Sequence, residues 1–342
     1  MQIRKLGRTG LKVSAICLGT MTFGNQADEA ESFSIMDRAW DGGVFFFDTA
    51  DAYPVPPLPE TVGRTEAILG RWLERNPGRR QDLVLASKCR FPMGKGPNHG
   101  GLSRRHVIAA CEASLRRLKT DWLDLYQAHA PDPDTPIEET LAAFDDLVRA
   151  GKIRYAGCSN FPAWQLAMAL GVSAAHGWAR LDCHQPRYNL LYRDIEAELL
   201  PLCRQQGVGV IAYNPLAGGF LTGKYQKDAA PPAGTRFTLG GQTGAIYRER
   251  YWQAAYFDAI EPLRAHCLAA VRPLGQLAIA WVLEQTGVTS AIVGASRAAQ
   301  LEQTLPAAEL ALSDEDRAAC DAVWYRIPRR PLTAGAVQPE RK

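Results

Sequence analysis

The chain has 342 residues, of which 46% are hydrophobic, so it can bury a substantial core. Its 39 lysines and arginines nearly balance 36 aspartates and glutamates, and the net charge of +3 gives no reason to expect nucleic acid or a membrane as a partner. No apolar stretch has the length of a membrane span, and the N-terminus lacks the apolar segment of a signal peptide.

Eight cysteines are scattered along the chain, with no C-x-x-C pair or His/Cys cluster that would indicate zinc. Several lie in apolar runs, where a reduced cysteine packs as a small hydrophobic residue. We therefore expect a reducing, cytoplasmic setting and no metal site.

Eight short apolar runs recur along the chain, and longer stretches with helical spacing lie between them. The runs do not alternate cleanly between apolar and polar residues, which is typical of strands buried on both faces. They cover residues 15–19, 44–48, 83–88, 122–129, 153–159, 180–185, 208–213 and 289–294.

The segments between the runs carry residues suited to helix termini. Asp28, Ser103 and Asp194 precede three of them as N-caps, while Pro136 opens a fourth and Gly151 follows it. The expected helices cover residues 29–40, 104–118, 137–150, 195–206 and 275–286.

The order of these elements limits the fold. Parallel strands joined by right-handed crossovers form either an open sheet or a closed one. Eight strands in about 280 residues fit a closed (β/α)8 TIM barrel better, and no G-x-G-x-x-G follows the first strand, as expected in an open dinucleotide-binding sheet. We expect an α/β fold with one barrel domain over residues 1–327.

Three segments fall outside the repeat. Residues 1–13 are expected to form a β-hairpin that turns around Gly7 and Gly10 and plugs one barrel mouth. Residues 214–250, rich in glycine and proline, are expected to form a long functional loop on the C-terminal face. The tail, residues 328–342, has little to bury and is expected to be disordered.

Polar residues end several of the expected strands, where catalytic groups lie in such barrels. In FFFDTADAY (45–53), the phenylalanines are expected to pack between barrel and helices while Asp48 reaches the active site. Taken alone, Asp48 could equally be a strand-end cap or a catalytic residue. Lys88 alone is better explained as a solvated charge, and His129 alone as a core histidine. Together, at consecutive strand ends, they favour catalysis. Other strands end in the same way at Ser159, Asn160, Gln185 and Tyr213.

These strand ends and their flanks give the sequence a close resemblance to the aldo-keto reductase family, over residues 1 to 327. The segments that carry it are LGTMTFG (18–24), DTADAY (48–53), SK (87–88), DLYQAHAPD (124–132), GKIRYAGCSNF (151–161), Gln185, AYNPLAGGFLTGKY (212–225) and VGASRAAQLEQ (293–303). The signal is specific because all eight occur in the right order, each at an expected strand end.

The resemblance implies reduction of a small-molecule aldehyde or ketone by hydride transfer. Tyr53 would be the general acid, and the ammonium of Lys88 would lower its pKa from the usual value of ~10. Asp48 would fix and balance Lys88. His129 would hydrogen-bond the substrate carbonyl and orient it.

The resemblance also assigns cofactor contacts. Ser159, Asn160 and Gln185 would hold the nicotinamide carboxamide, and Tyr213 would stack on the nicotinamide ring. Arg297 would meet the adenosine 2′-phosphate, which favours NADPH (NADP+) over NADH. The other positions assigned to the cofactor are Gly19, Thr20, Met21, Asn214, Pro215, Leu216, Gly218, Lys224, Gly294, Ser296, Gln300 and Gln303.

The sequence departs from the family's pattern at three places. Asn214 stands where many relatives have serine, and Gln303 and Thr304 replace the usual Glu–Asn pair at the adenine. Ala130 follows the histidine where a bulky aromatic is common, which predicts a wider pocket. The insertion at 54–64, PVPPLPETVGR, resembles one subgroup, and its four prolines predict a stiff loop over the site.

Two other functions stay open. The potassium-channel β subunits are relatives that bind NADPH tightly and turn over slowly, and the same site could instead oxidise a sugar or glycoside with NAD(P). A nucleoside triphosphatase is rejected, because G-x-x-x-x-G-K at 218–224 is followed by Tyr225 and not by the Ser/Thr that binds magnesium. The sequence specifies neither the substrate nor the oligomeric state.

Overall fold

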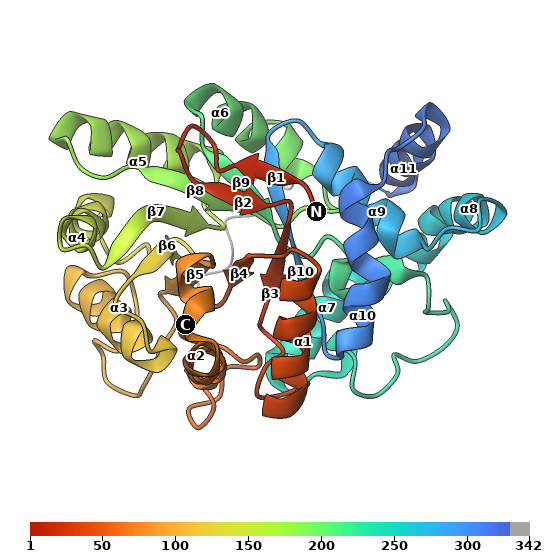
Figure 1. The fold of residues 1–342 in the computed structure, drawn as a ribbon. Coiled ribbons are helices and arrows are strands. Elements are labelled where there is room, and N and C mark those ends of the chain that lie inside the picture. Colours follow the sequence, from red (N-terminus) through yellow and green to blue (C-terminus); the bar gives the residue numbers. More distant parts are fainter. Residues whose placement is uncertain (329–342) are drawn as a thin grey trace.

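In a computed structural model of the protein, which describes residues 1–328, eight parallel strands form a closed barrel ringed by helices (Figure 1). The barrel order is β10, β3, β4, β5, β6, β7, β8, β9. This confirms the predicted (β/α)8 barrel, while the predicted tail lies outside the described residues except for Pro328. The strands are β3 (Ile16–Gly19), β4 (Phe46–Asp48), β5 (Val84–Cys89), β6 (Leu123–Ala128), β7 (Ile153–Ser159), β8 (Leu181–Gln185), β9 (Gly209–Ala212) and β10 (Val288–Gly294).

The helices begin largely where the sequence predicts. Asp28 accepts a hydrogen bond from the Glu31 amide at 2.8 Å, so it caps α1 as predicted. Asp194 does not cap α6: it opens a short 3₁₀ turn, which an ion pair between Arg193 and Glu196 closes at 2.7 Å. The α-helices are α1 (Glu29–Asp41), α2 (Arg64–Arg75), α3 (Arg104–Leu118), α4 (Ile137–Arg149), α5 (Ala163–His176), α6 (Leu199–Gln206), α7 (Gly241–Tyr251), α8 (Ala254–Ala269), α9 (Leu274–Glu284), α10 (Ala298–Thr304) and α11 (Asp314–Arg326).

The predicted N-terminal hairpin closes the barrel mouth at the N-terminal ends of the strands. Strands β1 (Ile3–Lys5) and β2 (Lys12–Ser14) pair antiparallel. The Arg8 amide donates to the Gly207 carbonyl at 2.8 Å, just before β9 begins. Leu6 is fully buried and packs in the cluster of side chains that fills the barrel interior. The hairpin therefore plugs the end opposite the strand termini that carry the candidate catalytic residues.

The phenylalanines before Asp48 do not all face the helices. Phe46 lies in the interior cluster, while Phe47 packs outward against Trp72, with ring centroids 5.6 Å apart. Successive side chains of a strand point to opposite faces, so Asp48 faces inward again. The prediction that these phenylalanines pack between barrel and helices is thus wrong for Phe46.

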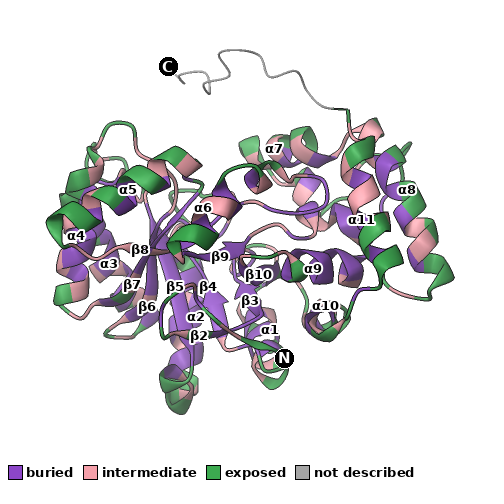
Figure 2. Ribbon diagram, turned by 90° about the horizontal axis from the view of Figure 1, so that it is seen from above, coloured by how far each residue is buried: buried purple, intermediate pink, exposed green. Residues whose placement is uncertain are grey.

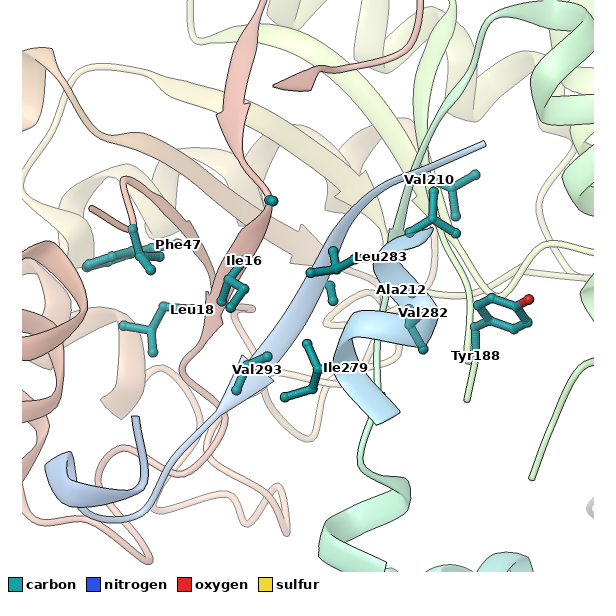
Figure 3. Close-up of a cluster of buried hydrophobic side chains, with 14 of the residues drawn as sticks. Ile16, Leu18, Phe47, Tyr188, Val210, Ala212, Ile279, Val282, Leu283 and Val293 are labelled. Carbon is teal, nitrogen blue, oxygen red and sulfur yellow. The ribbon is translucent and has the colours of Figure 1, made fainter. Parts of the chain in front are cut away.

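Two apolar layers hold the barrel together. The layer between strands and helices is the larger one; Figure 3 shows a part of it, where Ile279 of α9 lies beside Val293 of β10. Burial is concentrated in the strands and on the inner faces of the helices (Figure 2). Among residues 1–328 no single helix has both the length and the apolar composition to cross a membrane; only the pair α8–α9, bent by 105°, meets both together.

The segment after β9 is more regular than predicted. Residues 241–251 form α7, and short 3₁₀ helices cover Ala217–Thr222 and Arg236–Thr238. An aromatic cluster fixes this segment: the Trp252 ring lies 4.8 Å from Phe237, 5.0 Å from Tyr225 and 5.3 Å from Phe257. The prediction of an irregular loop over 214–250 is therefore wrong for α7, which packs over the C-terminal face.

Candidate active site

A pocket of about 310 Å³ opens at the C-terminal ends of the barrel strands. Its wall is formed by strand ends, by the segment after β4, and by residues of the segment after β9. The lining residues are Gly19, Thr20, Met21, Asp48, Ala52, Tyr53, Val55, Pro57, Phe91, His129, Ser159, Asn160, Gln185, Tyr213, Asn214, Arg236, Tyr247, Arg250, Ile292 and Gly294.

Lys88 lies beneath the pocket floor and joins two of the predicted catalytic residues. Its side chain is fully buried, and Nζ lies 2.5 Å from Asp48 Oδ2 and 3.5 Å from Tyr53 Oη. The third donor position of the ammonium is taken by the Thr49 carbonyl at 2.8 Å. The structure thus brings Asp48, Lys88 and Tyr53 into one connected group.

Two glutamines hold the other oxygen of Asp48. Gln185 Nε2 donates to Asp48 Oδ1 at 2.9 Å, and Gln127 Nε2 donates to the same oxygen at 3.2 Å. Both amides are buried. Each oxygen of the buried carboxylate therefore has a hydrogen-bond donor, as a polar group inside a barrel needs. Gln127 was not among the predicted site residues.

The surroundings shift the pKa values of three groups. Burial raises the pKa of the Tyr53 phenol; Lys88 acts in the opposite direction, but the net shift is upward. Burial lowers the pKa of Lys88, while Asp48 and then Tyr53 raise it by more. Burial, with the positive charges of Lys88 and Arg90, holds the pKa of His129 well below its usual range. At neutral pH the site therefore contains a protonated phenol, an ammonium and a neutral imidazole.

His129 lies beside Tyr53 at the pocket wall. The two rings meet edge to face, with centroids 5.7 Å apart, and Phe91 packs against the other side of the imidazole at 4.8 Å. Among the described residues, His129 Nδ1 has no hydrogen-bond partner although it is buried. Ala130 does not line the pocket, so the space beside His129 is limited by Phe91, which the sequence analysis missed.

Part of the predicted cofactor set lines the pocket: Gly19, Thr20, Met21, Ser159, Asn160, Gln185, Tyr213, Asn214 and Gly294. Tyr213 Oη donates to Asn160 Oδ1 at 2.8 Å, and Ser159 Oγ donates to the Gln185 carbonyl at 2.8 Å. The side-chain nitrogen of Gln185 is committed to Asp48, so only its oxygen is left to face a ligand.

The remaining predicted cofactor residues lie outside the pocket lining. Arg297 is exposed at the start of α10 and makes no ion pair with a described residue. Gln300 Oε1 accepts a hydrogen bond from the Ser296 amide at 2.9 Å, which orders the same turn. The others are Pro215, Leu216, Gly218, Lys224 and Gln303.

Several lining residues come from segments that the sequence analysis treated as loops without assigning roles. Val55 and Pro57 belong to the insertion at 54–64, which was predicted to lie over the site. Arg236, Tyr247 and Arg250 come from the segment after β9. No spacing rule marks these positions in the sequence, since their place depends on how α7 packs.

The arrangement of these residues is suited to proton transfer at the Tyr53 hydroxyl. A buried ion pair contacts the hydroxyl of Tyr53, and a neutral imidazole lies next to the same hydroxyl-bearing ring. Such a set suits protonation of an oxygen on which negative charge develops.

Comparisons with known proteins give the family of the chain. The chain matches the sequence model of the Aldo/keto reductase family over residues 15–325. It is 39% identical to a Bacillus subtilis (strain 168) protein named uncharacterized oxidoreductase YrpG, over 92% of this chain and 93% of that protein. It is 37% identical to a probable voltage-gated potassium channel subunit beta of Arabidopsis thaliana, over 91% and 92% of the two chains. Protein tas of Escherichia coli (strain K12) is 36% identical, over 94% and 97%.

Proposed function

Because the chain belongs to the aldo-keto reductase family of oxidoreductases, we propose that it reduces an aldehyde or ketone to the alcohol with NADPH, with Tyr53 as the proton donor. The observation that carries the proposal is the buried contact chain from Asp48 through Lys88 to the Tyr53 hydroxyl, with spacings of 2.5 and 3.5 Å, at the floor of the pocket. Family membership alone supports an oxidoreductase; the chain of contacts supports this proton donor.

The residues of the pocket fit a nicotinamide nucleotide. Tyr213 offers a flat aromatic wall, and the side-chain oxygens of Ser159, Asn160 and Gln185 offer acceptors for the N–H groups of a carboxamide. Arg236 adds a guanidinium suited to a phosphate oxygen. When bound, the nucleotide would supply a hydride to the carbonyl carbon of the substrate.

The protein's own groups would then complete the reduction. Tyr53 donates its phenolic proton to the carbonyl oxygen as negative charge develops there. The imidazole of His129, whose ring lies beside that of Tyr53, would donate a hydrogen bond to the same oxygen and orient it. The products are the alcohol and NADP+, and solvent returns a proton to Tyr53.

Replacing Tyr53 tests the proton-donor assignment. Tyr53→Phe keeps the ring and removes the hydroxyl, so we expect kcat for an aromatic aldehyde to fall about 10²- to 10⁴-fold, while the NADPH Kd from fluorescence titration changes little. Unchanged kcat would refute the assignment of Tyr53. No NADPH oxidation by the wild-type protein with any of a panel of aldehydes and ketones would refute the proposed function itself.

The preference for NADPH is supported by Arg297, whose guanidinium has no acidic partner among residues 1–328. Charge-assisted contacts to a phosphate are strong enough that we expect at least about tenfold tighter binding of NADPH than of NADH. Titrating both nucleotides under the same conditions gives the ratio, and equal affinities would contradict the preference.

A regulatory subunit is the second candidate, because the chain is 37% identical to a protein named probable voltage-gated potassium channel subunit beta. This candidate predicts tight NADPH binding with turnover slower than cofactor exchange. Single-turnover oxidation of bound NADPH by an aldehyde, compared with the NADPH dissociation rate, separates it from a reductase.

A further inference from the structure

Two arginines line the pocket without an acidic partner. Arg236 and Arg250 form no ion pair with any residue in the described part of the chain, and the one carboxylate in the lining, Asp48, already contacts Lys88 at 2.5 Å. Arg250 is half-buried. A half-buried guanidinium with no counter-charge is costly to desolvate and is a strong binding group for a carboxylate or a phosphate. The pocket therefore has an excess of positive charge that protein groups do not neutralise.

Arg236 contacts both a strand end and α7, since its guanidinium carbon lies 5.8 Å from the ring centroid of Tyr247. Arg236 Nη1 lies 3.6 Å from Met21 Sδ, and its Nη2 would lie 3.8 Å from a Cβ on Gly294. Met21 and Gly294 belong to the strand ends assigned to the nucleotide. Arg236 is thus placed where it would serve the nucleotide.

Arg250, from α7, lines the same pocket as Tyr213. Burial raises the pKa of the Tyr213 phenol, and the positive charges of Arg250 and then Arg187 oppose that shift. Tyr213 Oη in turn donates to Asn160 at 2.8 Å, and Asn160 Nδ2 donates to the His129 carbonyl at 3.1 Å. Tyr213, Asn160 and His129 are thus connected along one part of the pocket that Arg250 also lines.

One face of α7 presents both Arg250 and Tyr247 to the pocket, since residues three apart lie on the same helix face. Tyr247 Oη lies 3.5 Å from Asn214 Oδ1, and Tyr247 and Tyr53 both line the pocket, so α7 and the proposed proton donor border the same space. The space between them is small, because the whole pocket is about 310 Å³ and would also contain the nicotinamide.

From this arrangement we propose that the preferred substrates are small carbonyl compounds that carry a carboxylate or a phosphate, and that Arg250 binds that anionic group. This inference rests on the proposed carbonyl reduction at the same site. The reacting carbonyl would lie at Tyr53 and His129, and the anionic group would extend towards α7.

Matched substrate pairs test the proposal. For each pair we measure kcat/KM of the wild-type protein with NADPH: 4-oxobutanoate against butanal for a carboxylate, and glyceraldehyde 3-phosphate against glyceraldehyde for a phosphate. A charge-assisted contact predicts that the anionic member is favoured about tenfold or more in at least one pair. The pair with the larger ratio identifies which anion the site takes.

Variants of Arg250 test whether this side chain causes the preference for anionic substrates. Arg250→Met keeps most of the side-chain length and removes the charge, so the anionic-to-neutral ratio should fall about tenfold, mainly through KM. Arg250→Lys should retain part of the preference. Arg105→Met, which removes an exposed arginine of α3 that does not line the pocket, should leave the ratio as in the wild-type protein.

The outcomes separate this inference from the function on which it rests. Equal kcat/KM for both members of each pair, or the same ratio in wild type and Arg250→Met, overturns the role of Arg250 while carbonyl reduction stands. A raised NADPH Kd in Arg250→Met with an unchanged ratio also overturns it and assigns the arginine to the nucleotide. If the wild-type protein binds NADPH but reduces no aldehyde, the proposed function fails and this inference fails with it.

Discussion

Lys88 is a fully buried cation that is balanced by a single carboxylate, that of Asp48. Removing one member of a buried ion pair leaves an uncompensated charge and costs about 3–5 kcal/mol. A Lys88 variant alone would therefore mix lost stability with lost chemistry. The double variant Asp48→Asn/Lys88→Met removes both charges and measures the net effect of the ion pair on Tyr53.

We predict that this double variant shifts the pH dependence of alcohol oxidation upward. Oxidation needs Tyr53 as the phenolate, so its rate rises with pH as the phenol loses its proton. Lys88 lowers the Tyr53 pKa more than Asp48 raises it, so loss of both raises that pKa further. We expect the rising limb of kcat/KM to move up by about one pH unit.

The matched control for this prediction is Ser87→Ala, next to Lys88 on β5. Ser87 points away from the pocket and donates to Glu66 at 2.5 Å. Its pH profile should follow that of the wild-type protein. An unmoved limb in the double variant would mean that the Asp48–Lys88 pair has no net effect on the Tyr53 pKa.

Asp48, Tyr53, Lys88 and His129 were predictable because each ends a strand or follows one closely, and strand ends of a barrel meet at one rim. Gln127 carried a signal that was overlooked: it lies on β6 two residues before His129, which directly follows that strand, so both face inward. Phe91 and Arg250 carried none, since their positions depend on how irregular segments and α7 pack over the rim.

At the scale of elements, helices α8 and α11 are joined through one carboxylate. Asp316, near the start of α11, contacts His266 of α8 at 2.7 Å and accepts from Arg272, just after α8, at 2.9 Å. It also accepts from the Ser313 amide at 3.0 Å, completing a capping box. Hydrogen bonds from Arg272 hold the Asp316 pKa well below its usual range, with His266 adding to the effect and burial opposing it.

We predict that Asp316→Asn destabilises the protein by about 2–3 kcal/mol at pH 7, the range for hydrogen bonds to charged groups. The Asp316 pKa is depressed in the folded state, so its contribution is full above the unfolded-state value of about 3.9 and is lost as pH falls through the lower folded value. The wild-type-to-variant difference in the free energy of unfolding should therefore shrink in acid.

Urea unfolding at pH 7, 5 and 3 measures this difference. The matched control is Asp314→Asn in the same helical turn, because the Asp314 side chain is 98% exposed and pairs only with partly exposed Arg317. It should cost less than about 0.5 kcal/mol. A difference for Asp316→Asn that stays constant with pH would contradict the pKa argument.

The elements themselves were predictable to different degrees. All eight barrel strands follow from their apolar runs, because strands of a parallel sheet are buried on both faces. The helix α7 did not, since GQTGAIYRERY has glycines and little apolar periodicity and is held by the neighbouring aromatic cluster around Trp252. Asp194 failed as a cap because Arg193 and Glu196 favour a tighter turn.

At the scale of the whole molecule, the two mouths of the barrel have different roles. The pocket occupies the C-terminal mouth, where strand ends and α7 present polar groups. The β1–β2 hairpin fills the other mouth with Leu6 and Val13, both fully buried. Gly7 is needed for this fit, because a Cβ there would lie 2.4 Å from the Gly207 carbonyl oxygen. Stability and chemistry should therefore be separable by mutation.

Leu6→Ala tests that separation. Truncating a buried leucine costs about 2–5 kcal/mol, and the lost methyl groups lie at the mouth farthest from Tyr53 and Lys88. We therefore expect a lower urea midpoint with kcat/KM within about twofold of wild type at temperatures where the variant stays folded. Ile3→Ala, also on the hairpin but 62% exposed, is the matched control and should change neither quantity much. Leu6 packs in the interior cluster that also contains Phe46 and Ala86. A clear fall in kcat/KM while Leu6→Ala is still folded would therefore mean that the hairpin helps to position the catalytic residues through this cluster.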